Sequence, residues 1–105
     1  MHLETRTVSA KTSLDGKLEI SKATAARLGL MGATVPVRIE VSPGTAPIDG
    51  VAWLASMECT CRKTGVEGAH VHLFLTCDQF RSLPALQPVG LEIENGRVYV
   101  RPAAL

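Results

Sequence analysis

A chain of 105 residues has room for one domain with one core, and it excludes a catalytic domain beside a separate binding domain. With 46% apolar and 20% charged residues, the composition is typical of a globular protein and excludes intrinsic disorder. The formal charge of +1 excludes a general attraction to nucleic acid, so any such binding would depend on a local basic patch.

The N-terminus and the cysteines predict the compartment. Residues 1–6 lack the basic-then-apolar order of a signal peptide, and no apolar run reaches the length of a membrane span. Three cysteines are an odd number, and Cys59 and Cys61 are too close along one strand to bridge each other comfortably. Free thiols are typical of a reducing compartment. We therefore expect a cytoplasmic protein with no membrane partner.

The N-terminal segment predicts a hairpin followed by a helix. Residues 8–12 and residues 17–20 alternate apolar and polar side chains, and Asp15-Gly16 between them is a turn signal. This pattern predicts a β-hairpin. Ser21 is a favourable N-cap for residues 22–28, whose alanines raise helix propensity. A short helix is expected there.

The middle of the chain predicts a strand, a loop and a second hairpin. In residues 35–41, β-branched side chains alternate with other residues, which predicts a strand. Pro36 has no N–H to donate to a ladder, so we expect either that this strand lies at a sheet edge or that Pro36 lies at the start of the strand. Residues 42–50 concentrate proline and glycine and predict a loop between two halves. Residues 51–57 and 69–75 then predict the two strands of another hairpin.

The C-terminal segment predicts a helical turn and a third hairpin. Thr76 precedes residues 77–83, which we expect to form a helical turn. Asn95-Gly96 separates the alternating residues 91–94 and 97–100. Asn-Gly tolerates the positive φ angles of a type I′ turn, so this segment predicts a tight hairpin.

The two halves share one order of elements, namely a hairpin, a Ser or Thr cap, a short helix and a strand. This order indicates either two pseudo-symmetric ββαβ halves, residues 1–46 and 51–105, or a chance similarity between two amphipathic stretches. We predict a single small β-rich α+β domain, built as a partly open barrel with two short helices.

Residues 15–35 carry a glycine, a basic residue, alternating aliphatics, a lysine, a short helix, Leu-Gly-aliphatic, a glycine and a valine-bearing strand. The positions concerned are Gly16, Lys17, Leu18, Ile20, Lys22, Leu28, Gly29, Leu30, Gly32 and Val35. This run resembles the swapped-hairpin module of AbrB-like transition-state regulators and antitoxins. Ser21, Thr24 and Ala25 depart from the family pattern, which has proline, an aliphatic residue and arginine there. One residue is also missing before Gly32.

The resemblance implies a barrel of interleaved hairpin units and loosely sequence-specific DNA binding through basic residues of the first hairpin. Lys17 and Lys22 match the family pattern, and Lys11 and Arg27 lie on the same stretch. Acidic residues lie between them and would weaken the attraction to phosphate. The alternative is an ordinary solvated strand and helix face.

Two cysteines and two histidines on the second hairpin could hold zinc. Alternation puts Cys59 and Cys61 on one face of their strand, and His70 and His72 on one face of theirs. If Cys61 lies opposite His70, ligand types suited to tetrahedral zinc converge. If the register slips by one residue, Cys59 faces Val71 and the histidines point to the other side. We favour the second register, in which the cysteines are small core residues, and expect no metal or cofactor.

Cys77 is the one candidate nucleophile. It lies at the first turn of a predicted helix, where backbone N–H groups would favour a thiolate. The chain has no signature for a base that a third group orients, and no glycine-rich phosphate loop or nucleophile elbow. We therefore interpret Cys77 as a buried thiol and predict that the protein is not an enzyme.

The aromatic residues suggest a different surface. Trp53 is interpreted as a core residue. Tyr99 shares one strand face with Arg97 and Arg101, and these residue types are enriched at interface hot spots, although a plain strand surface would have the same pattern. The expected function is a binding domain: an AbrB-like DNA-binding regulator or antitoxin, or alternatively a protein-interaction domain, including a homodimer. A zinc-binding domain is the third alternative.

Overall fold

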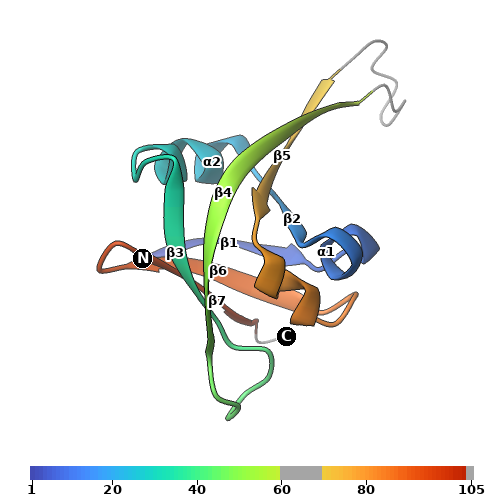
Figure 1. Ribbon diagram of the computed structural model, residues 1–105, viewed down its shortest axis with the longest axis vertical. Coiled ribbons are helices and arrows are strands. Elements are labelled where there is room, and N and C mark those ends of the chain that lie inside the picture. The colour runs from blue at the N-terminus through green and yellow to red at the C-terminus, as the bar shows by residue number, and fades with distance from the viewer. Residues whose placement is uncertain (60–69, 104–105) are drawn as a thin grey trace.

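The computed structural model describes residues 1–59 and 70–103. Within them, seven strands form one sheet in the order β1-β6-β7-β3-β4-β5-β2. The strands are β1 His2–Thr7, β2 Lys17–Ile20, β3 Thr34–Ile39, β4 Ile48–Cys59, β5 His70–Thr76, β6 Pro88–Glu94 and β7 Arg97–Pro102. The helices are α1 Ala10–Asp15, α2 Lys22–Gly29 and the 3₁₀ helix η2 Asp78–Ser82. The sheet curls into a nearly closed barrel (Figure 1), which confirms the predicted fold class.

The core fills the barrel because alternate side chains of each strand point inward. The fully buried larger side chains include Leu18, Leu28, Val37, Ile39, Leu75, Phe80, Leu83, Leu91, Val98 and Val100. They come from five strands, from α2 and from the segment around η2, so one apolar cluster holds the sheet and these helices together. Among the described residues, no helix is long and apolar enough to cross a membrane.

The hairpin predicted over residues 8–20 is wrong. Helix α1 occupies this segment, capped by the Ser9 side chain, whose Oγ accepts a bond from the Thr12 amide at 3.4 Å. Gly16 ends the helix with a φ of 70°. β1 pairs with β6 and β2 pairs with β5, so the two strands are not partners in the ladder. The capping residues at both ends of the segment favour a short helix over a direct turn.

The helix after Ser21 and the strand after it are confirmed. The Ser21 side chain accepts from the Thr24 amide at 3.2 Å and caps α2. Of the two alternatives for Pro36, the sheet edge is wrong, because β3 lies between β4 and β7, whereas Pro36 does lie near the start of β3, two residues after Thr34. The β7 pairing begins only at Val37, one residue beyond Pro36. Proline therefore lies where one side of β3 has no ladder partner.

The last two hairpins are confirmed, with one correction at the helix between them. β4 and β5 are antiparallel, and residues 60–69 between them lie outside the described residues. Cys77, and not Thr76, is the N-cap of the helical turn, which is the 3₁₀ helix η2. Asn95 and Gly96 have φ angles of 53° and 73°, the type I′ turn expected from their identity.

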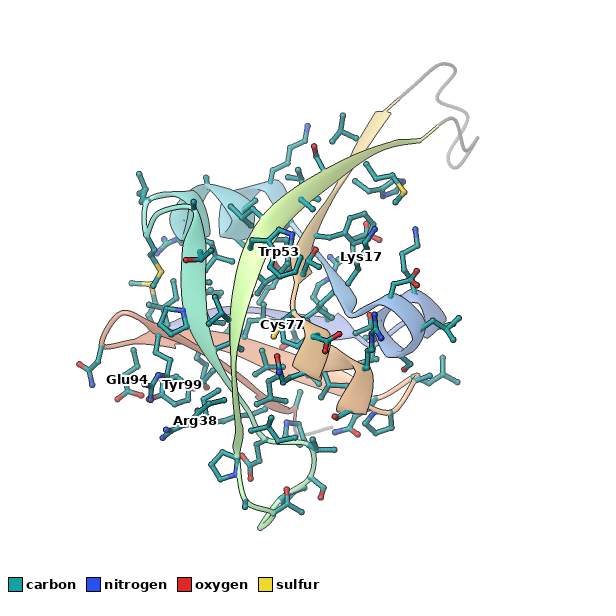
Figure 2. All side chains as sticks on the ribbon, viewed as in Figure 1. Lys17, Arg38, Trp53, Cys77, Glu94 and Tyr99 are labelled. Atoms are coloured by element: carbon teal, nitrogen blue, oxygen red, sulfur yellow. The ribbon has the colours of Figure 1, made fainter. Side chains whose placement is uncertain are left out.

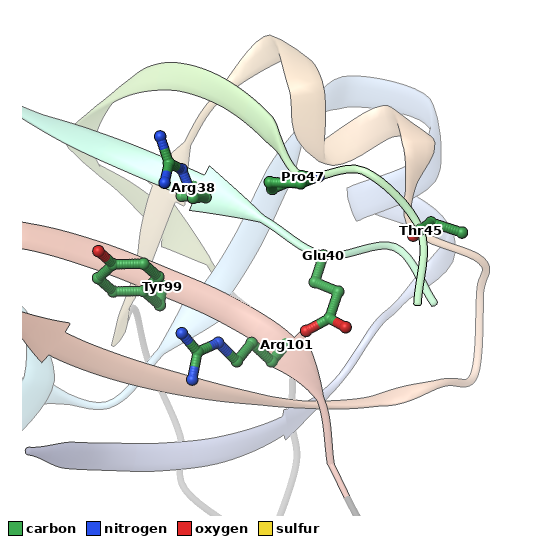
Figure 3. Close-up of a pocket in the computed structure, with 6 residues that line it drawn as sticks. All are labelled: Arg38, Glu40, Thr45, Pro47, Tyr99 and Arg101. Carbon is green, nitrogen blue, oxygen red and sulfur yellow. The ribbon is translucent and has the colours of Figure 1, made fainter. Parts of the chain in front are cut away.

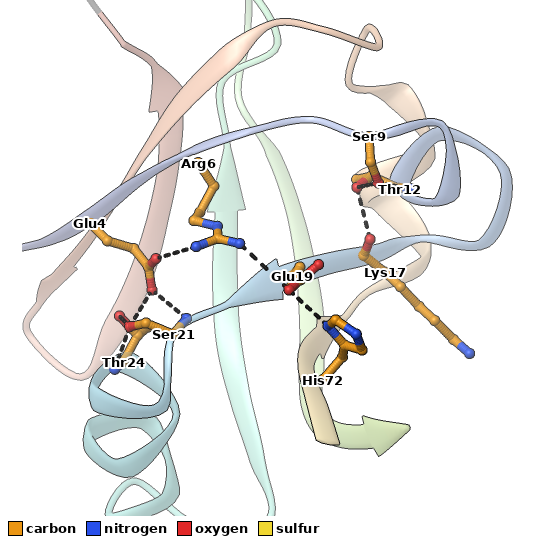
Figure 4. Close-up of polar contacts among 9 residues, drawn as sticks. All are labelled: Glu4, Arg6, Ser9, Thr12, Lys17, Glu19, Ser21, Thr24 and His72. Atoms are coloured by element: carbon orange, nitrogen blue, oxygen red, sulfur yellow. Dashed lines mark hydrogen bonds and ion pairs between the residues drawn. The ribbon is translucent and has the colours of Figure 1, made fainter. Parts of the chain in front are cut away.

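The barrel is closed at its seam by side chains rather than by a ladder. β1 and β2 are the two ends of the sheet order. Across that seam, Glu4 Oε2 accepts bonds from the Ser21 amide and hydroxyl, both at 3.0 Å, and Arg6 lies 3.7 Å from Glu19 Oε2 (Figure 4). Burial raises the pKa of the Glu4 carboxyl, but hydrogen bonds from Thr24 and Ser21 outweigh it and lower the pKa below its usual value.

β2 and β5, which lie in different halves of the sequence, pair with each other. Leu18 stands opposite Leu75, and Ile20 stands opposite Leu73. Because α1 replaces the first predicted hairpin, the order of elements in the N-terminal half differs from the one expected. The internal repeat over residues 1–46 and 51–105 stays a prediction.

Candidate functional site

The outer face of β7 carries the three residues that the sequence placed together. Val98 and Val100 point into the core and are fully buried. Arg97, Tyr99 and Arg101 alternate with them; Arg97 and Tyr99 are half-buried and Arg101 is exposed. They therefore lie on one outward face, next to β3 on one side and β6 on the other. Their role in protein interaction stays a prediction.

A row of polar side chains crosses this face from β6 to β4. In register, the row consists of Glu92, Tyr99, Arg38 and Asp49. Arg101 stacks on Tyr99, with its guanidinium carbon 4.8 Å from the ring centroid, and it donates to Glu92 at 3.2 Å. Arg38 donates to both carboxylate oxygens of Asp49, at 2.8 and 3.3 Å. Tyr99 thus has an oriented guanidinium on either side.

The ion pair between Arg38 and Asp49 sets their charges. The hydrogen bond and the charge of Asp49 raise the pKa of Arg38, and the same bond lowers the pKa of the Asp49 carboxyl. Both groups are therefore charged at neutral pH. Because the pair is exposed to solvent, its contribution to stability is small. Its structural effect is to fix the plane of the Arg38 guanidinium.

A cleft opens beside Tyr99, next to the loop between β3 and β4 (Figure 3). The cleft has a volume of about 470 Å³, and its lining residues are Arg38, Glu40, Thr45, Pro47, Tyr99 and Arg101. The Thr45 hydroxyl donates to the Ser42 carbonyl at 2.7 Å and accepts from the Ser42 amide, which holds the loop as a turn. The volume is within the range of ligand-binding clefts in proteins.

Trp53 lies on the same outer face, so its prediction as a core residue is wrong. Along β4, Asp49, Val51 and Trp53 point outward, and Trp53 is 47% exposed. Figure 2 shows Trp53 beside β4 near the middle of the view, and Arg38 and Tyr99 at its lower left. The inward position between Val51 and Trp53 is Ala52, which is fully buried. In the sequence of β4, the small residues Gly50 and Ala52 alternate with the larger Val51 and Trp53. This alternation was the signal that Trp53 points outward.

Gly50 explains why the small residues of β4 face inward. A Cβ atom at this position would lie 2.4 Å from Gln79 Oε1 and 2.9 Å from Cys77 Sγ. The junction of β5 and η2 therefore packs directly against the β4 backbone. A larger inward side chain would push this junction away.

The four basic residues predicted to bind DNA lie on three separate elements. Lys11 is on α1, Lys17 on β2, and Lys22 and Arg27 are on α2. Lys11 Nζ lies 5.1 Å from the centroid of the Phe74 ring. Among the described residues, none of the four forms an ion pair with a carboxylate. The structure does not gather them on a hairpin.

Both registers considered for the zinc ligands are wrong. Cys59 stands opposite His70, and Met57 stands opposite His72. Cys61 and the side chains of Cys59 and His70 lie outside what the structure describes. His72 Nδ1 lies 3.1 Å from Glu19 Oε2. In the described ranges, no three His, Cys, Asp or Glu residues are close enough to hold a metal ion, and the absence of zinc stays a prediction.

Cys77 is a buried core residue, as the sequence predicted. Its thiol donates to Gln79 Oε1 at 3.2 Å, and none of its surface is exposed. Burial raises the pKa of this thiol, and the backbone groups of Gln79 and Phe80 oppose the shift only in part. The protonated thiol is favoured, which is the reverse of what a nucleophile needs.

Comparison with known proteins finds no matching family model, no matching curated protein and no matching solved structure. The resemblance of residues 15–35 to AbrB-like proteins stays a prediction.

Proposed function

We propose that this domain is a non-enzymatic binding module that recognises another protein through the outer face of β7, β3 and β4. The observation that carries the proposal is the position of Tyr99 in the cleft between Arg38 and Arg101. Tyrosine, arginine and tryptophan are the residues that most often dominate the energy of protein interfaces. Trp53 lies on the same face, as does Val51, which is 56% exposed.

Burial of this face would contribute free energy on association. A tryptophan side chain has roughly 200 Å² of surface, so about half of it remains available at Trp53. Removing that area from water contributes about 2–3 kcal/mol. The two arginines are already oriented by carboxylates, so less side-chain entropy is lost when a partner binds.

The proposal is tested by peptide display on the immobilised domain. Peptides selected from a random library should bind Tyr99→Ala and Trp53→Ala at least tenfold more weakly than the parent. Arg81→Ala is the matched control, because Arg81 is an exposed arginine paired with Asp78 on η2, away from this face. Selected peptides that bind all variants equally would contradict the proposal. Sedimentation of the parent and of Tyr99→Ala tests whether the partner is a second copy.

DNA binding through Lys11, Lys17, Lys22 and Arg27 is the second candidate function. It is favoured because, in the part of the chain that the structure describes, these four cations lack carboxylate partners. If they contact phosphates, the affinity for a DNA duplex should fall steeply with salt, and the double reversal Lys17→Glu with Lys22→Glu should abolish binding. Arg81→Glu should leave it unchanged. Absence of binding at low salt would exclude this function.

A further inference from the structure

We propose that a second copy of this chain pairs with the open side of β4 and joins two barrels into a dimer. This proposal is separate from the proposed binding function of the outer face of β7, β3 and β4. β3 pairs with β4 only from Ile48 to Trp53, whereas β5 pairs with it from Trp53 to Cys59. Within the described chain, residues 54–59 therefore have a ladder partner on one side only. The open side of β5 is shorter and covers residues 70–72.

The open part of β4 extends beyond the barrel together with the start of β5 (Figure 1). A two-stranded ribbon of this kind is only marginally stable by itself in water. The side chains of Leu54, Met57 and Val71 on this ribbon are each at least 36% exposed. Leu54 and Met57 lie on opposite faces, because successive residues of a strand alternate. An added strand would therefore stabilise the ribbon through a new ladder and would cover apolar surface on both faces.

Other open strand sides of this molecule have features that prevent pairing with another chain. β1 has a bulge between His2 and Glu4. β2 carries the charged residues Lys17 and Glu19, and β3 has Pro36 where the β7 ladder has not yet begun. Bulges, charges and prolines are the usual means of protecting a sheet edge. The open part of β4 has no proline, lysine or arginine, and its register with β5 is continuous, so this edge is the one suited to pairing.

The sequence of this edge is complementary to itself in an antiparallel pair, which selects a second copy as the partner strand. A two-fold axis through Ser56 puts Ser56 opposite its own copy and Met57 opposite the small Ala55, on both sides of the axis. Glu58, the only charged residue of the segment, then stands opposite Leu54, about 13 Å along the strands from its own copy. An axis through Met57 would instead put the two Met57 residues opposite each other. Pairing through Ser56 uses the β4 edge of both copies, so association stops at the dimer.

Cysteine cross-linking tests the position of the axis. In chains with Cys59 and Cys61 replaced by serine, Ser56→Cys should form a disulfide-linked dimer under mild oxidation, because directly opposite residues have Cβ atoms about 4.5–5.5 Å apart. Leu54→Cys is the matched control on the same strand face, and it should not cross-link, because its copy would lie about 13 Å away. Cys77 is fully buried and does not contribute. Equal yields of cross-linked dimer from the two variants would overturn the proposal.

Charge substitutions at Ser56, measured by sedimentation equilibrium, test the dimer itself. The parent should be a dimer, and Ser56→Lys and Ser56→Glu should each raise its dissociation constant at least tenfold, because like charges would face each other across the axis. An equimolar mixture of the two variants should regain the affinity of the parent, which a folding defect in either variant would prevent. Ser82→Lys, at an exposed serine of η2, is the matched control and should leave the dimer unchanged. A parent that stays monomeric at millimolar concentration would overturn the proposal, as would a dimer that Tyr99→Ala dissociates and Ser56→Lys does not.

Discussion

Replacement of Gly16 by alanine should destabilise the domain strongly, for two separate reasons. Gly16 has a φ of 70°, a conformation that costs a residue with a Cβ about 1–2 kcal/mol. In addition, the Cβ would lie only 2.5 Å from the carbonyl oxygen of Cys77, a backbone atom that cannot rotate away. Relief requires moving the junction of β5 and η2, and overpacking of this kind costs about 1–3 kcal/mol. The total expected loss is about 2–5 kcal/mol.

Gly96→Ala is the matched control, because Gly96 has a φ of 73° but no atom within 4 Å of the Cβ position. It should lose only the backbone contribution, about 1–2 kcal/mol. Urea and thermal unfolding of both variants isolate the contact with Cys77, with a difference of roughly 5–15 °C in Tm. Equal losses in the two variants would refute the close approach of α1 to the Cys77 carbonyl.

Three further predictions concern Gly50, Glu4 and Cys77. Gly50→Ala should destabilise by about 1–3 kcal/mol in urea unfolding, because its Cβ would lie 2.9 Å from the buried Cys77 Sγ, whereas the contact with Gln79 Oε1 can be relieved by rotation of that side chain. The pKa of Glu4 is lowered on folding, so its contribution to stability is present above the unfolded pKa and lost as the pH falls through the folded pKa. Glu4→Gln should therefore cost about 1–2 kcal/mol at pH 7 and less at pH 3, and an equal loss at both pH values would contradict this reasoning. With the other two cysteines replaced by serine, Cys77 should react with a thiol reagent far more slowly in native protein than in denaturant, because it is buried and its pKa is raised. Equal rates would show that the thiol is accessible.

The elements that sequence alone predicted are those whose stability depends on neighbouring residues. Asn95-Gly96 adopts the type I′ turn because both residues tolerate positive φ, whatever surrounds them. Ser21 caps α2 through a bond to an amide three residues away. The alternation on β7 likewise placed Tyr99 beside two arginines on one face before any tertiary contact was known. These signals lie within a few residues of the element they specify.

Tertiary structure decided what depends on distant partners. The partners of β1 and β2 are an example: β1 pairs with β6 and β2 pairs with β5, and not with each other, although the caps of the helix between them are local. The close packing of Cys77 against Gly50 turns the small residues of β4 inward and exposes Trp53. The cleft exists only because β3 and β7 pair in parallel and bring Arg38 beside Tyr99. A one-residue change of register reverses every side chain of a strand at little local cost, so only packing against distant residues selects the face.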